Sequence, residues 1–436
     1  MNTVTTAPEQ DSEAPSSFEG LGIDPKFLGM LKRAGYSEPT PIQKQSLPVT
    51  LQGADVLGIA QTGTGKTLAF GVPMIQRLVT GGGIGLVVLP TRELAVQVES
   101  SLHRIGKEIG LKTALLIGGE AMGKQLRALK FSPHILIATP GRLIDHLEQK
   151  TARLNTVKVL VLDEADRMLD MGFAPQLKRI LQEVPEERQT MLFSATMPDA
   201  IVNIAKQYMK LPVRVEVAKP GTAASTIAQE VVFVHRADKP LVLKELLAEE
   251  QGTVLVFTRT KFGAKKVAKL VRDWGYTSNE LHSNRTLAQR LAALNGFKKG
   301  IYRVLVATDI AARGIDAAGI ALVVNFDLPM QPEDYVHRIG RTGRAGKAGK
   351  AISIAAIEER RDVREIERLI GKMLPVKKVS SVATPATPVY DSPRAASPFA
   401  SARSRPASRF SGRQKSFRRP SRPSVPSGSR RSGRMR

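Results

Sequence analysis

The strongest constraint on the fold is a repeated alternation of short apolar runs with longer segments of helical periodicity. An uninterrupted apolar strand is buried on both faces, so helices must cover both sides of a parallel sheet. We therefore predict an α/β domain over residues 18–217. Its apolar runs stand at residues 86–89, 115–117, 135–138, 157–162 and 190–193.

The same alternation starts again in the second half of the chain. A charge-laced helical segment closes this second series near Leu374. We predict a second α/β domain with a parallel sheet over residues 227–374. Residues 218–226, AKPGTAAST, are small and polar, as expected of a linker between the two domains. The runs of the second series are 231–234, 254–257, 304–307, 322–326 and 351–355.

Both ends of the chain differ from these domains in composition. Residues 1–17 are polar, and residues 375–436 are rich in Ser, Pro and Arg, so we predict that both segments are disordered. The C-terminal tail holds 3 Lys and 12 Arg against Asp391, which is +14 of the net charge of +25. We expect this tail to tether nucleic acid. The alternative is a solvated tail without a specific partner.

Composition also excludes several classes of function. The chain has no cysteine, so it forms no disulfide, thiolate zinc site or thiol nucleophile. The N-terminus lacks the basic start and apolar run of a secretory signal, and no stretch has the apolar length of a membrane span. We expect a cytoplasmic protein without a membrane partner. The basic charge favours a nucleic-acid partner over a protein that is merely soluble and basic.

A glycine-rich sequence between a predicted strand at 55–59 and a predicted helix has the pattern of a phosphate-binding loop. Its glycines allow backbone N–H groups to surround a phosphate at the helix N-terminus. Lys66 is expected to reach the β- and γ-phosphates, and the Thr67 hydroxyl to bind Mg²⁺. The alternative is a simple glycine turn. The nucleotide-binding residues are Ala60, Gln61, Thr62, Gly63, Thr64, Gly65, Lys66 and Thr67.

Two carboxylates follow the apolar strand at 157–162, where an open α/β sheet forms its crevice. Asp163 is expected to hold Mg²⁺ directly or through water, and Glu164 to orient and activate a water molecule. In isolation this pair could equally be an acidic turn in solvent. It follows the phosphate-binding loop by about a hundred residues, which favours the catalytic interpretation.

Gln43 suggests that the nucleotide is ATP. A glutamine amide accepts a hydrogen bond from adenine N6 and donates one to N7, whereas guanine presents two acceptors at that edge. Tyr36 and Phe18 are aromatic residues that could pack against the base. For each of these three residues, read alone, a plain packing role is an equal alternative.

The ordered set of motifs resembles the DEAD-box RNA helicases of superfamily two, over about residues 18–372, and most closely the bacterial RhlE-like group. After the glutamine motif and the phosphate-binding loop come PTRELA at 90–95, Gly118-Gly119, TPGR at 139–142, DEAD at 163–166 and SAT at 194–196. The second domain carries VFTRT at 256–260, ATDIAARGID at 307–316 and HRIGRTGR at 337–344.

The resemblance implies two tandem RecA-like domains with ATP and RNA bound between them. Arg341 and Arg344 would be arginine fingers, and Asp316 would contact the ribose. Ser194 and Thr196 would couple the ATP and RNA sites through Asp166 or its neighbours, and His337 would join this network or be a structural histidine. RNA-backbone contacts would come from Thr91, Arg92, Gly119, Thr139, Arg142, Arg259, Thr308 and Gly314, although the arginines could instead form a solvated face.

One stretch departs from the family pattern. The family usually reads His-Gly-Asp-Lys-Ser-Gln, whereas this chain has Ser283 and Leu287 at the glycine and glutamine positions after His282. We expect weaker coupling between RNA and ATP as the consequence.

The resemblance implies an RNA-stimulated ATPase that locally unwinds short duplexes, with ATP and Mg²⁺ as cofactors and single-stranded RNA and short RNA duplexes as partners. Ribosomal or RNA-decay proteins are compatible further partners. An ATP-locked RNA clamp or annealing factor would use the same motifs. A DNA translocase and an ATP-binding protein without hydrolysis fit the motifs less well.

Overall fold

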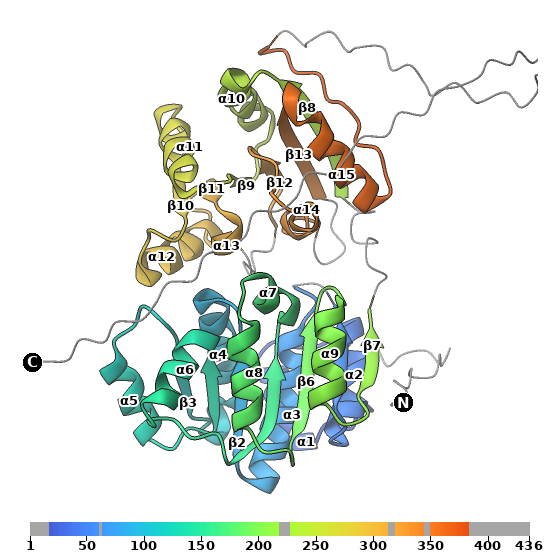
Figure 1. Cartoon of the computed structure of the whole chain (residues 1–436), viewed down its shortest axis with the longest axis vertical. Coiled ribbons are helices and arrows are strands. Elements are labelled where there is room, and N and C mark those ends of the chain that lie inside the picture. The colour runs from blue at the N-terminus through green and yellow to red at the C-terminus, as the bar shows by residue number, and fades with distance from the viewer. Residues whose placement is uncertain (1–16, 61–62, 218–226, 313–318, 344–348, 383–436) are drawn as a thin grey trace, which may run out of the picture. The chain divides into compact units, whose positions relative to one another are not determined.

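The computed structural model describes residues 17–60, 63–217, 227–312, 319–343 and 349–382. We call residues 17–217 the first lobe and residues 227–382 the second lobe. Each lobe contains one parallel β-sheet with helices on both faces (Figure 1), so the predicted α/β fold class is confirmed. The predicted linker at 218–226 lies outside the described residues, as do nearly all of the N-terminal segment and residues 383–436 of the tail.

The first lobe has a seven-stranded sheet in the order β3-β4-β2-β5-β6-β1-β7, and every neighbouring pair is parallel. The central strands are apolar and fully buried, as uninterrupted apolar runs predict. The strands are β1 (Val56–Ile59), β2 (Ile84–Val88), β3 (Thr113–Leu116), β4 (Ile135–Ala138), β5 (Val157–Leu162), β6 (Gln189–Ser194) and β7 (Val213–Glu216).

Helices cover both faces of this sheet because alternate strand residues point to opposite sides. Val87 packs in the core under the first four helices, whereas its neighbours Leu86 and Val88 pack under the helices that follow. The first group is α1 (Pro25–Arg33), α2 (Pro41–Leu51), α3 (Lys66–Gly81) and α4 (Arg92–Gly106). The second group is α5 (Met122–Lys130), α6 (Pro140–Glu148), α7 (Ala165–Asp170), α8 (Ala174–Glu183) and α9 (Asp199–Tyr208).

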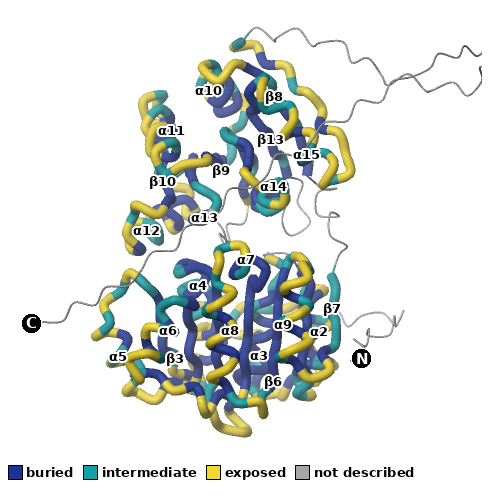
Figure 2. The backbone as a smooth tube through the Cα atoms, viewed as in Figure 1, coloured by how far each residue is buried: buried dark blue, intermediate teal, exposed yellow. Residues whose placement is uncertain are grey.

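The second lobe has a six-stranded sheet in the order β10-β11-β9-β12-β13-β8, again parallel throughout. Figure 2 shows these strands as the buried centre of the lobe. They are β8 (Ile227–Val234), β9 (Val254–Phe257), β10 (Ser278–Leu281), β11 (Val304–Ala307), β12 (Leu322–Asn325) and β13 (Gly349–Ala356).

Two helices cover one face of the second sheet and four cover the other. Leu255 packs with the four-helix side and Val256 with the two-helix side, as strand alternation requires. The two-helix side consists of α10 (Lys239–Glu249) and α11 (Lys261–Asp273). The four-helix side consists of α12 (Leu287–Lys298), α13 (Asp309–Ala312), α14 (Pro332–Ile339) and α15 (Arg360–Ile370).

The chain continues to pack against the second lobe after Leu374, so the predicted start of the disordered tail at Pro375 was wrong. Val376 forms a parallel bridge with Val231 of β8, and the Lys377 N–H donates to the Val231 carbonyl at 2.8 Å. Val379 is buried in the core beside α10 and α11. We call residues 375–382 the strap. Its Pro, Lys and Ser composition is typical of a tail, but Val379 packs in the core and the backbone at Val376 and Lys377 pairs with β8.

The predicted apolar runs lie within or overlap their strands, and the run at 157–162 matches β5 from end to end. Two strands, β7 and β10, were not predicted. Both lie at edges of their sheets, where half-exposed strands need no continuous apolar run. Among the described residues, no helix is both long and apolar enough to cross a membrane.

Candidate nucleotide and RNA sites

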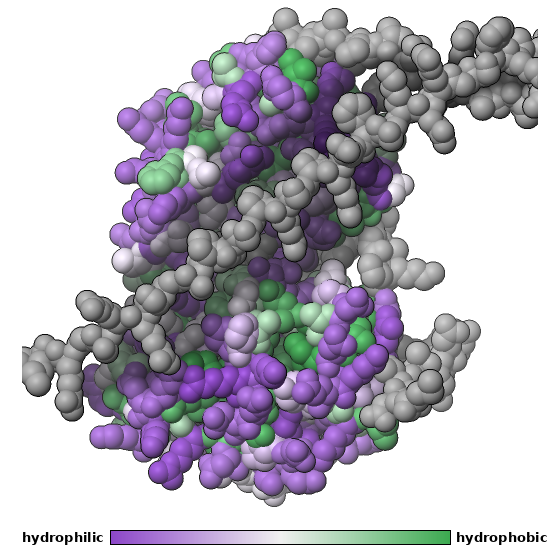
Figure 3. Space-filling view, in the orientation of Figure 1, coloured by the Kyte–Doolittle hydropathy of each residue, from purple (hydrophilic) through white to green (hydrophobic). Residues whose placement is uncertain are grey.

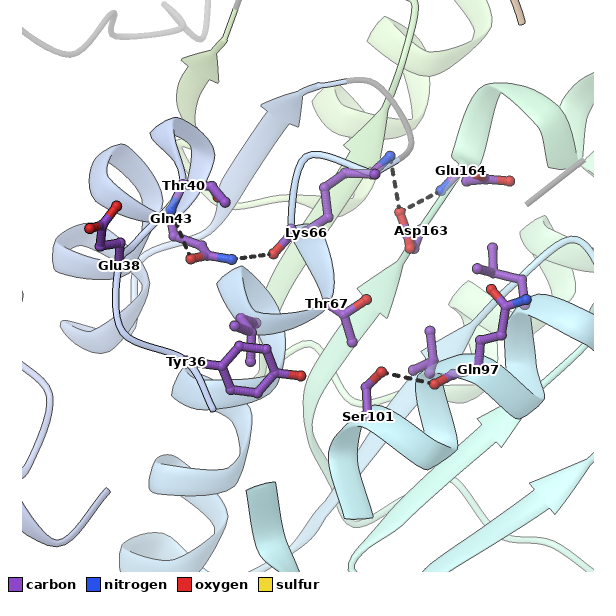
Figure 4. Close-up of a pocket in the computed structure, with 15 residues that line it drawn as sticks. Tyr36, Glu38, Thr40, Gln43, Lys66, Thr67, Gln97, Ser101, Asp163 and Glu164 are labelled. Carbon is purple, nitrogen blue, oxygen red and sulfur yellow. Dashed lines mark hydrogen bonds and ion pairs between the residues drawn. The ribbon is translucent and has the colours of Figure 1, made fainter. Parts of the chain in front are cut away.

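A cavity of about 270 Å³ in the first lobe gathers most of the predicted nucleotide-binding residues (Figure 4). It lies beside the carboxyl ends of β1 and β5, where a doubly wound sheet binds its ligand. The loop after β1 supplies the glycines and lysine, and the loop after β5 supplies the carboxylates. The lining residues that carry the prediction are Tyr36, Gln43, Gly63, Gly65, Lys66, Thr67, Asp163 and Glu164.

The phosphate-binding loop is shaped by two glycines. Gly63 and Gly65 have φ angles of 89° and 90°, which residues with a Cβ rarely adopt. Gly65 also lies so close to Gln43 that an added Cβ would stand 2.4 Å from the Gln43 Nε2. Gln61 and Thr62 lie outside the described residues, between Ala60 and Gly63, and Thr64 is described.

Gln43 holds the phosphate-binding loop, a role that the sequence did not reveal. Its Nε2 donates to the Gly65 carbonyl at 2.7 Å, and its Oε1 accepts from the Thr40 N–H at 3.0 Å. An amide has two N–H groups and two lone pairs on its oxygen, so each end keeps one position for a further bond. The adenine contact of Gln43 stays a prediction, and the geometry adds a direct link between this residue and the loop.

The two aromatic candidates differ in position. Tyr36 lines the cavity and is half-buried, which leaves its ring available to a base. Phe18 is buried in the hydrophobic core of the first lobe and does not line the cavity. The packing alternative therefore describes Phe18, and the base-stacking prediction remains only for Tyr36.

Lys66 and Asp163 point toward each other across the cavity (Figure 4). The Lys66 Nζ lies 3.4 Å from the Asp163 Oδ1 and donates to the Ala60 carbonyl at 3.2 Å. Burial raises the pKa of Asp163, while the nearby Lys66 ammonium opposes this shift and the Glu164 carboxylate adds to it. This buried, incompletely neutralised carboxylate would be stabilised by a divalent cation.

Glu164 occupies a strained position at the end of β5. Its φ of 53° lies in the left-handed region, which costs a non-glycine residue about 1–3 kcal/mol. The turn directs the Glu164 N–H to the Asp163 Oδ1 at 2.9 Å. The Glu164 side chain pairs with Arg167 at 3.0 Å, a partner that the sequence reading did not identify. Strain of this kind is concentrated at functional sites.

Asp166 connects β5 with the end of β6. Its Oδ2 accepts from the Thr196 hydroxyl at 2.9 Å and from the Thr196 and Ala195 N–H groups at 2.9 and 3.0 Å. The Asp166 N–H donates to the Ser194 Oγ at 3.3 Å. The predicted hydrogen bonds between Asp166 and the SAT residues are therefore present. Their coupling to RNA stays a prediction.

The predicted RNA contacts of the first lobe follow β2, β3 and β4, which are neighbours at one end of the sheet. The nucleotide residues follow β1, β5 and β6 in the other half of the sheet. Topology thus separates the two candidate sites along one edge of the sheet. The RNA candidates there are Thr91 and Arg92 after β2, Gly119 after β3, and Thr139 and Arg142 after β4.

These side chains also build the local structure. Thr91 caps α4 by accepting from the Leu94 N–H at 3.3 Å, and Thr139 is the N-cap residue of α6. Arg142 donates to the Glu120 carbonyl at 3.1 Å and pairs with Asp145 at 3.2 Å, so it is held by protein groups rather than by solvent alone.

In the second lobe the structure describes only part of the predicted set. Arg259 follows β9 and Thr308 follows β11, which are neighbouring strands. The Arg259 guanidinium lies 3.5 Å from Glu359, so binding RNA phosphate would require it to exchange this partner. Gly314, Asp316 and Arg344 lie outside the described residues.

Arg341 and His337 lie at the end of α14. The Arg341 Nε donates to the His337 carbonyl at 3.1 Å, and the His337 Nδ1 lies 3.9 Å from Asp334. The sequence reading missed a third residue of this motif, Arg338. Its guanidinium donates to the Asp309 carboxylate at 2.7 Å and to the Asp327 carbonyl at 2.6 Å. Arg338 therefore holds the predicted RNA-contact segment after β11 against the end of β12.

The segment that departs from the family pattern has its own charge cluster. Glu280 at the end of β10 is almost fully buried and pairs with Arg285. The His282 Nε2 lies 3.6 Å from Glu280, and burial lowers the pKa of His282, with Glu280 opposing the shift. The loop that carries Ser283 is thus held by Glu280 and Arg285.

Two family models match the chain, "DEAD/DEAH box helicase" over residues 40–204 and "Helicase conserved C-terminal domain" over residues 238–346. The DEAD-box ATP-dependent RNA helicase CshA of Geobacillus kaustophilus is 44% identical over 329 residues, which are 75% of this chain and 70% of that protein. The chain belongs to the DEAD-box ATP-dependent RNA helicases. It is therefore an ATPase that binds ATP and RNA. CshA of Listeria monocytogenes is 43% identical over 75% of this chain and 63% of its own length.

Solved DEAD-box structures share this fold. Saccharomyces cerevisiae Dbp5 bound to RNA and ADP BeF3 matches with a TM-score of 0.75 and 30% identity, covering 83% of this chain and 96% of Dbp5. The helicase Mss116 bound to ssRNA and UDP-BeF matches with a TM-score of 0.78 and 28% identity, covering 86% of this chain and 82% of that one. The sequence-based assignment to two RecA-like domains agrees with these likenesses.

Proposed function

We propose that this DEAD-box helicase uses ATP bound in the first-lobe cavity to grip single-stranded RNA, bend it and separate short duplexes locally. The observation that carries the proposal is the gathering of Gly63, Gly65, Lys66 and Asp163 around one cavity. Lys66 and the loop N–H groups bind the β- and γ-phosphates. Gln43 contacts the base and also bonds the Gly65 carbonyl, so it links base binding to the phosphate-binding loop.

Mg²⁺ fits the oxygen groups at this cavity. The Thr67 hydroxyl and the Asp163 carboxylate both line it, and hard oxygen ligands are those that Mg²⁺ prefers. Magnesium at nucleotide sites uses one or two protein groups together with phosphates and water, so a large protein ligand cluster is not needed. When bound, the ion neutralises charge on the phosphates.

Hydrolysis requires a water molecule oriented by Glu164, which would accept a hydrogen bond from it. Arg167 keeps the Glu164 carboxylate in place before the water is bound. Arg341 and Arg344 from the second lobe then stabilise charge on the transferring phosphoryl group. Asp316 contacts the ribose. One active site is thereby formed by both predicted domains, 18–217 and 227–374, the second of which is extended by the strap.

RNA binds along the strand ends that carry small residues and hydroxyls. In the first lobe these are the ends of β2, β3 and β4, and in the second lobe those of β9 and β11. Both lobes bind both ligands, so ATP and RNA each favour closure and each tightens the other. The helix that starts at Pro140 bends the strand, and the bent strand no longer pairs in a regular duplex.

ATPase measurements with and without RNA test this proposal. The wild-type chain should hydrolyse ATP faster with RNA, and both Lys66→Ala and Glu164→Gln should lose turnover by about 10²-fold or more. Glu164→Gln should still retain RNA in the presence of ATP, whereas Lys66→Ala should not. RNA-independent turnover, or full turnover in both variants, would contradict the proposal.

Strand-displacement and strand-annealing assays separate unwinding from an ATP-locked clamp or annealing factor. The proposal expects displacement of a short duplex that depends on ATP hydrolysis. Annealing without displacement would favour the clamp. Equal stimulation of the ATPase by DNA would favour a DNA translocase.

The tail is proposed to tether RNA near the active site. Residues 383–436 are strongly basic, with Asp391 as their one acidic residue. A chain truncated after Val382 should bind RNA more weakly at low salt and keep its basal ATPase. If the truncated chain binds RNA as tightly as the full chain, the tail does not act as a tether.

Finer assignments also belong to this proposal. The motifs resemble the RhlE-like group, whereas the curated relatives described above carry the name CshA. A phylogenetic tree that places the chain inside the CshA branch would remove the RhlE assignment. We further propose a cytoplasmic location with partners from ribosome assembly or RNA decay, which affinity purification from the native cell would test.

A further inference from the structure

The outer face of α11 in the second lobe combines positive charge with an exposed aromatic ring. Its inner face packs in the core through Ala264, Val267, Ala268 and Val271, at the spacing of one helical stripe. The other face is exposed along its length (Figure 2), and hydrophilic residues cover most of this region in Figure 3. The packing of the lobe therefore does not determine the residue types on this face.

The charge on this face is predominantly positive. Lys265, Lys266 and Lys269 are exposed, and among the described residues no carboxylate lies within 4.0 Å of their ammonium groups. Within α11 the acidic residue Asp273 stands at the last position.

Phe262 stands beside these lysines and is 71% exposed. The Lys261 Nζ lies 5.3 Å from the centre of the Phe262 ring and donates to the Asn284 Oδ1 at 3.0 Å. The ring is thus supported on one side by a cation and faces solvent. An exposed aromatic ring among unpaired lysines is the combination that binds single-stranded nucleic acid, because bases stack on the ring and phosphates bind the cations.

The position of α11 connects this face to the proposed RNA site. The helix starts directly after β9, whose end carries Arg259, and β9 neighbours β11, whose end carries Thr308. From Phe262 to Lys269 the helix advances roughly 10 Å at 1.5 Å per residue, enough to follow RNA leaving the strand ends.

We propose that the outer face of α11 is an auxiliary binding site for single-stranded RNA that extends beyond the main groove, with Phe262 stacking on a base and Lys265, Lys266 and Lys269 binding phosphates. The inference rests on the proposed RNA contacts at the ends of β9 and β11. It adds a site outside them, which lengthens the RNA that the second lobe holds. An acidic protein segment would match the lysines but would not require a stacking surface.

Binding of the full-length chain to oligouridines of two lengths tests the aromatic part of the site. A short RNA of about six nucleotides covers the main groove, and one of about twenty nucleotides also reaches α11. Phe262→Ala should weaken binding of the long RNA about five- to tenfold and leave the short RNA unchanged. Phe262→Trp should keep wild-type affinity, because tryptophan also stacks. Leu241→Ala, on the exposed side of α10, is the matched control and should change neither.

Salt dependence tests the lysines. Replacing Lys265, Lys266 and Lys269 together by Gln should lower the slope of log affinity against log salt by about 2 for the long RNA, since each phosphate contact contributes about 0.7 for a single strand. A control triple variant of Lys244, Arg368 and Lys372 to Gln removes the same charge from other exposed positions of the lobe and should keep the slope. Basal ATPase should be unchanged in every variant.

Three results would overturn the site. In the first, Phe262→Ala binds the long RNA as tightly as the wild type does. In the second, the control triple variant loses as much salt slope as the α11 triple variant, and in the third, Phe262→Ala loses affinity equally for short and long RNA. If RNA of any length fails to stimulate the wild-type ATPase, the proposed function fails instead. If RNA stimulates the wild-type ATPase but the α11 variants bind RNA as the wild type does, this inference alone is overturned.

Discussion

The two lobes share one strand order but differ in what stands at the strand ends. Reading both sheets from the same side, β3-β4-β2-β5-β6-β1 of the first lobe corresponds to β10-β11-β9-β12-β13-β8 of the second. The first lobe carries the phosphate-binding loop after β1 and the carboxylates after β5. The corresponding ends of β8 and β12 carry no glycine-rich loop. The same topology therefore carries the candidate phosphate-binding loop in the first lobe, whereas the described residues after β8 and β12 form no such loop.

Lys66 and Lys239 show the difference most clearly. Each is the first residue of the helix after an equivalent strand, and each approaches an aspartate after another equivalent strand, Asp163 or Asp327. Lys239 is closer to Glu359, at 3.1 Å, and to the Phe326 carbonyl, at 3.2 Å. Its charge is thus used inside the lobe, whereas Lys66 faces a cavity.

The edges of the two sheets correspond as well. In the first lobe β7 follows the last helix and pairs in parallel with β1. In the second lobe the strap follows the last helix and pairs in parallel with β8, the equivalent of β1. The strap thus takes the place of a seventh strand. This correspondence explains why the folded lobe extends beyond Leu374.

The largest expected effect separates the two lysines. Lys66→Ala should lower ATP turnover by about 10²- to 10³-fold, because the side chain expected to bind the β- and γ-phosphates is lost. Lys239→Ala should leave the ATP site intact but destabilise the second lobe by about 1–3 kcal/mol, because Glu359 loses its nearer cation and keeps Arg259 at 3.5 Å. Turnover assays and chemical denaturation measure the two effects. A catalytic loss from Lys239→Ala in a folded chain would break the comparison.

Truncation tests the correspondence between the strap and β7. A chain ending at Leu374 should lose about 2 kcal/mol of stability in the second lobe, since Val379 leaves the core. A chain ending at Val382 should keep the stability of the full chain. Hydrogen exchange of β8 would report the loss locally. Equal protection of β8 in both truncations would show that the strap is dispensable.

Acid should weaken both lobes through buried histidines. Burial lowers the pKa of His146 in the first lobe and of His282 in the second, from the usual value of 6.5. The unfolded chain then takes up protons first, so stability is full above pH 6.5 and falls as the pH decreases toward the folded pKa. The slope is at most about 1.4 kcal/mol per pH unit for each histidine.

His146 bonds Gln125 and Thr151 in the first lobe, and His282 lies 3.6 Å from Glu280 in the second. His146→Gln should flatten the pH dependence of unfolding of the first lobe, and His282→Gln should flatten that of the second. An unchanged pH dependence in either variant would show that its histidine does not contribute.

The smallest expected effect concerns a feature that the lobes share. Thr91 and Thr260 cap the helices after the equivalent strands β2 and β9, each accepting from the backbone N–H three residues later. Replacement of either by Ala should cost about 1 kcal/mol, and Ser should restore most of it. A loss in one lobe only would show that the caps are not equivalent.

The buried strands and most of the residues that line the first-lobe cavity could be predicted from the sequence, because both depend on local patterns. An apolar run such as 254–257 indicates a strand that is covered on both faces. A glycine-rich phosphate-binding loop is recognised from the strand before it and the helix after it in the sequence. The strap, the Gln43 bond to Gly65 and the Arg338 network were missed. Each joins residues far apart in the chain through backbone groups or ordinary side chains. Such contacts leave no local signal.

The RNA-stimulated ATPase of an Arg341→Ala, Arg344→Ala double variant tests the central claim most directly. That claim is that the first lobe binds the phosphates of the nucleotide, while Arg341 and Arg344 of the second lobe complete the site for hydrolysis. The variant should bind ATP with nearly wild-type affinity and lose turnover by about 10³-fold or more. Wild-type turnover in the double variant would contradict the claim.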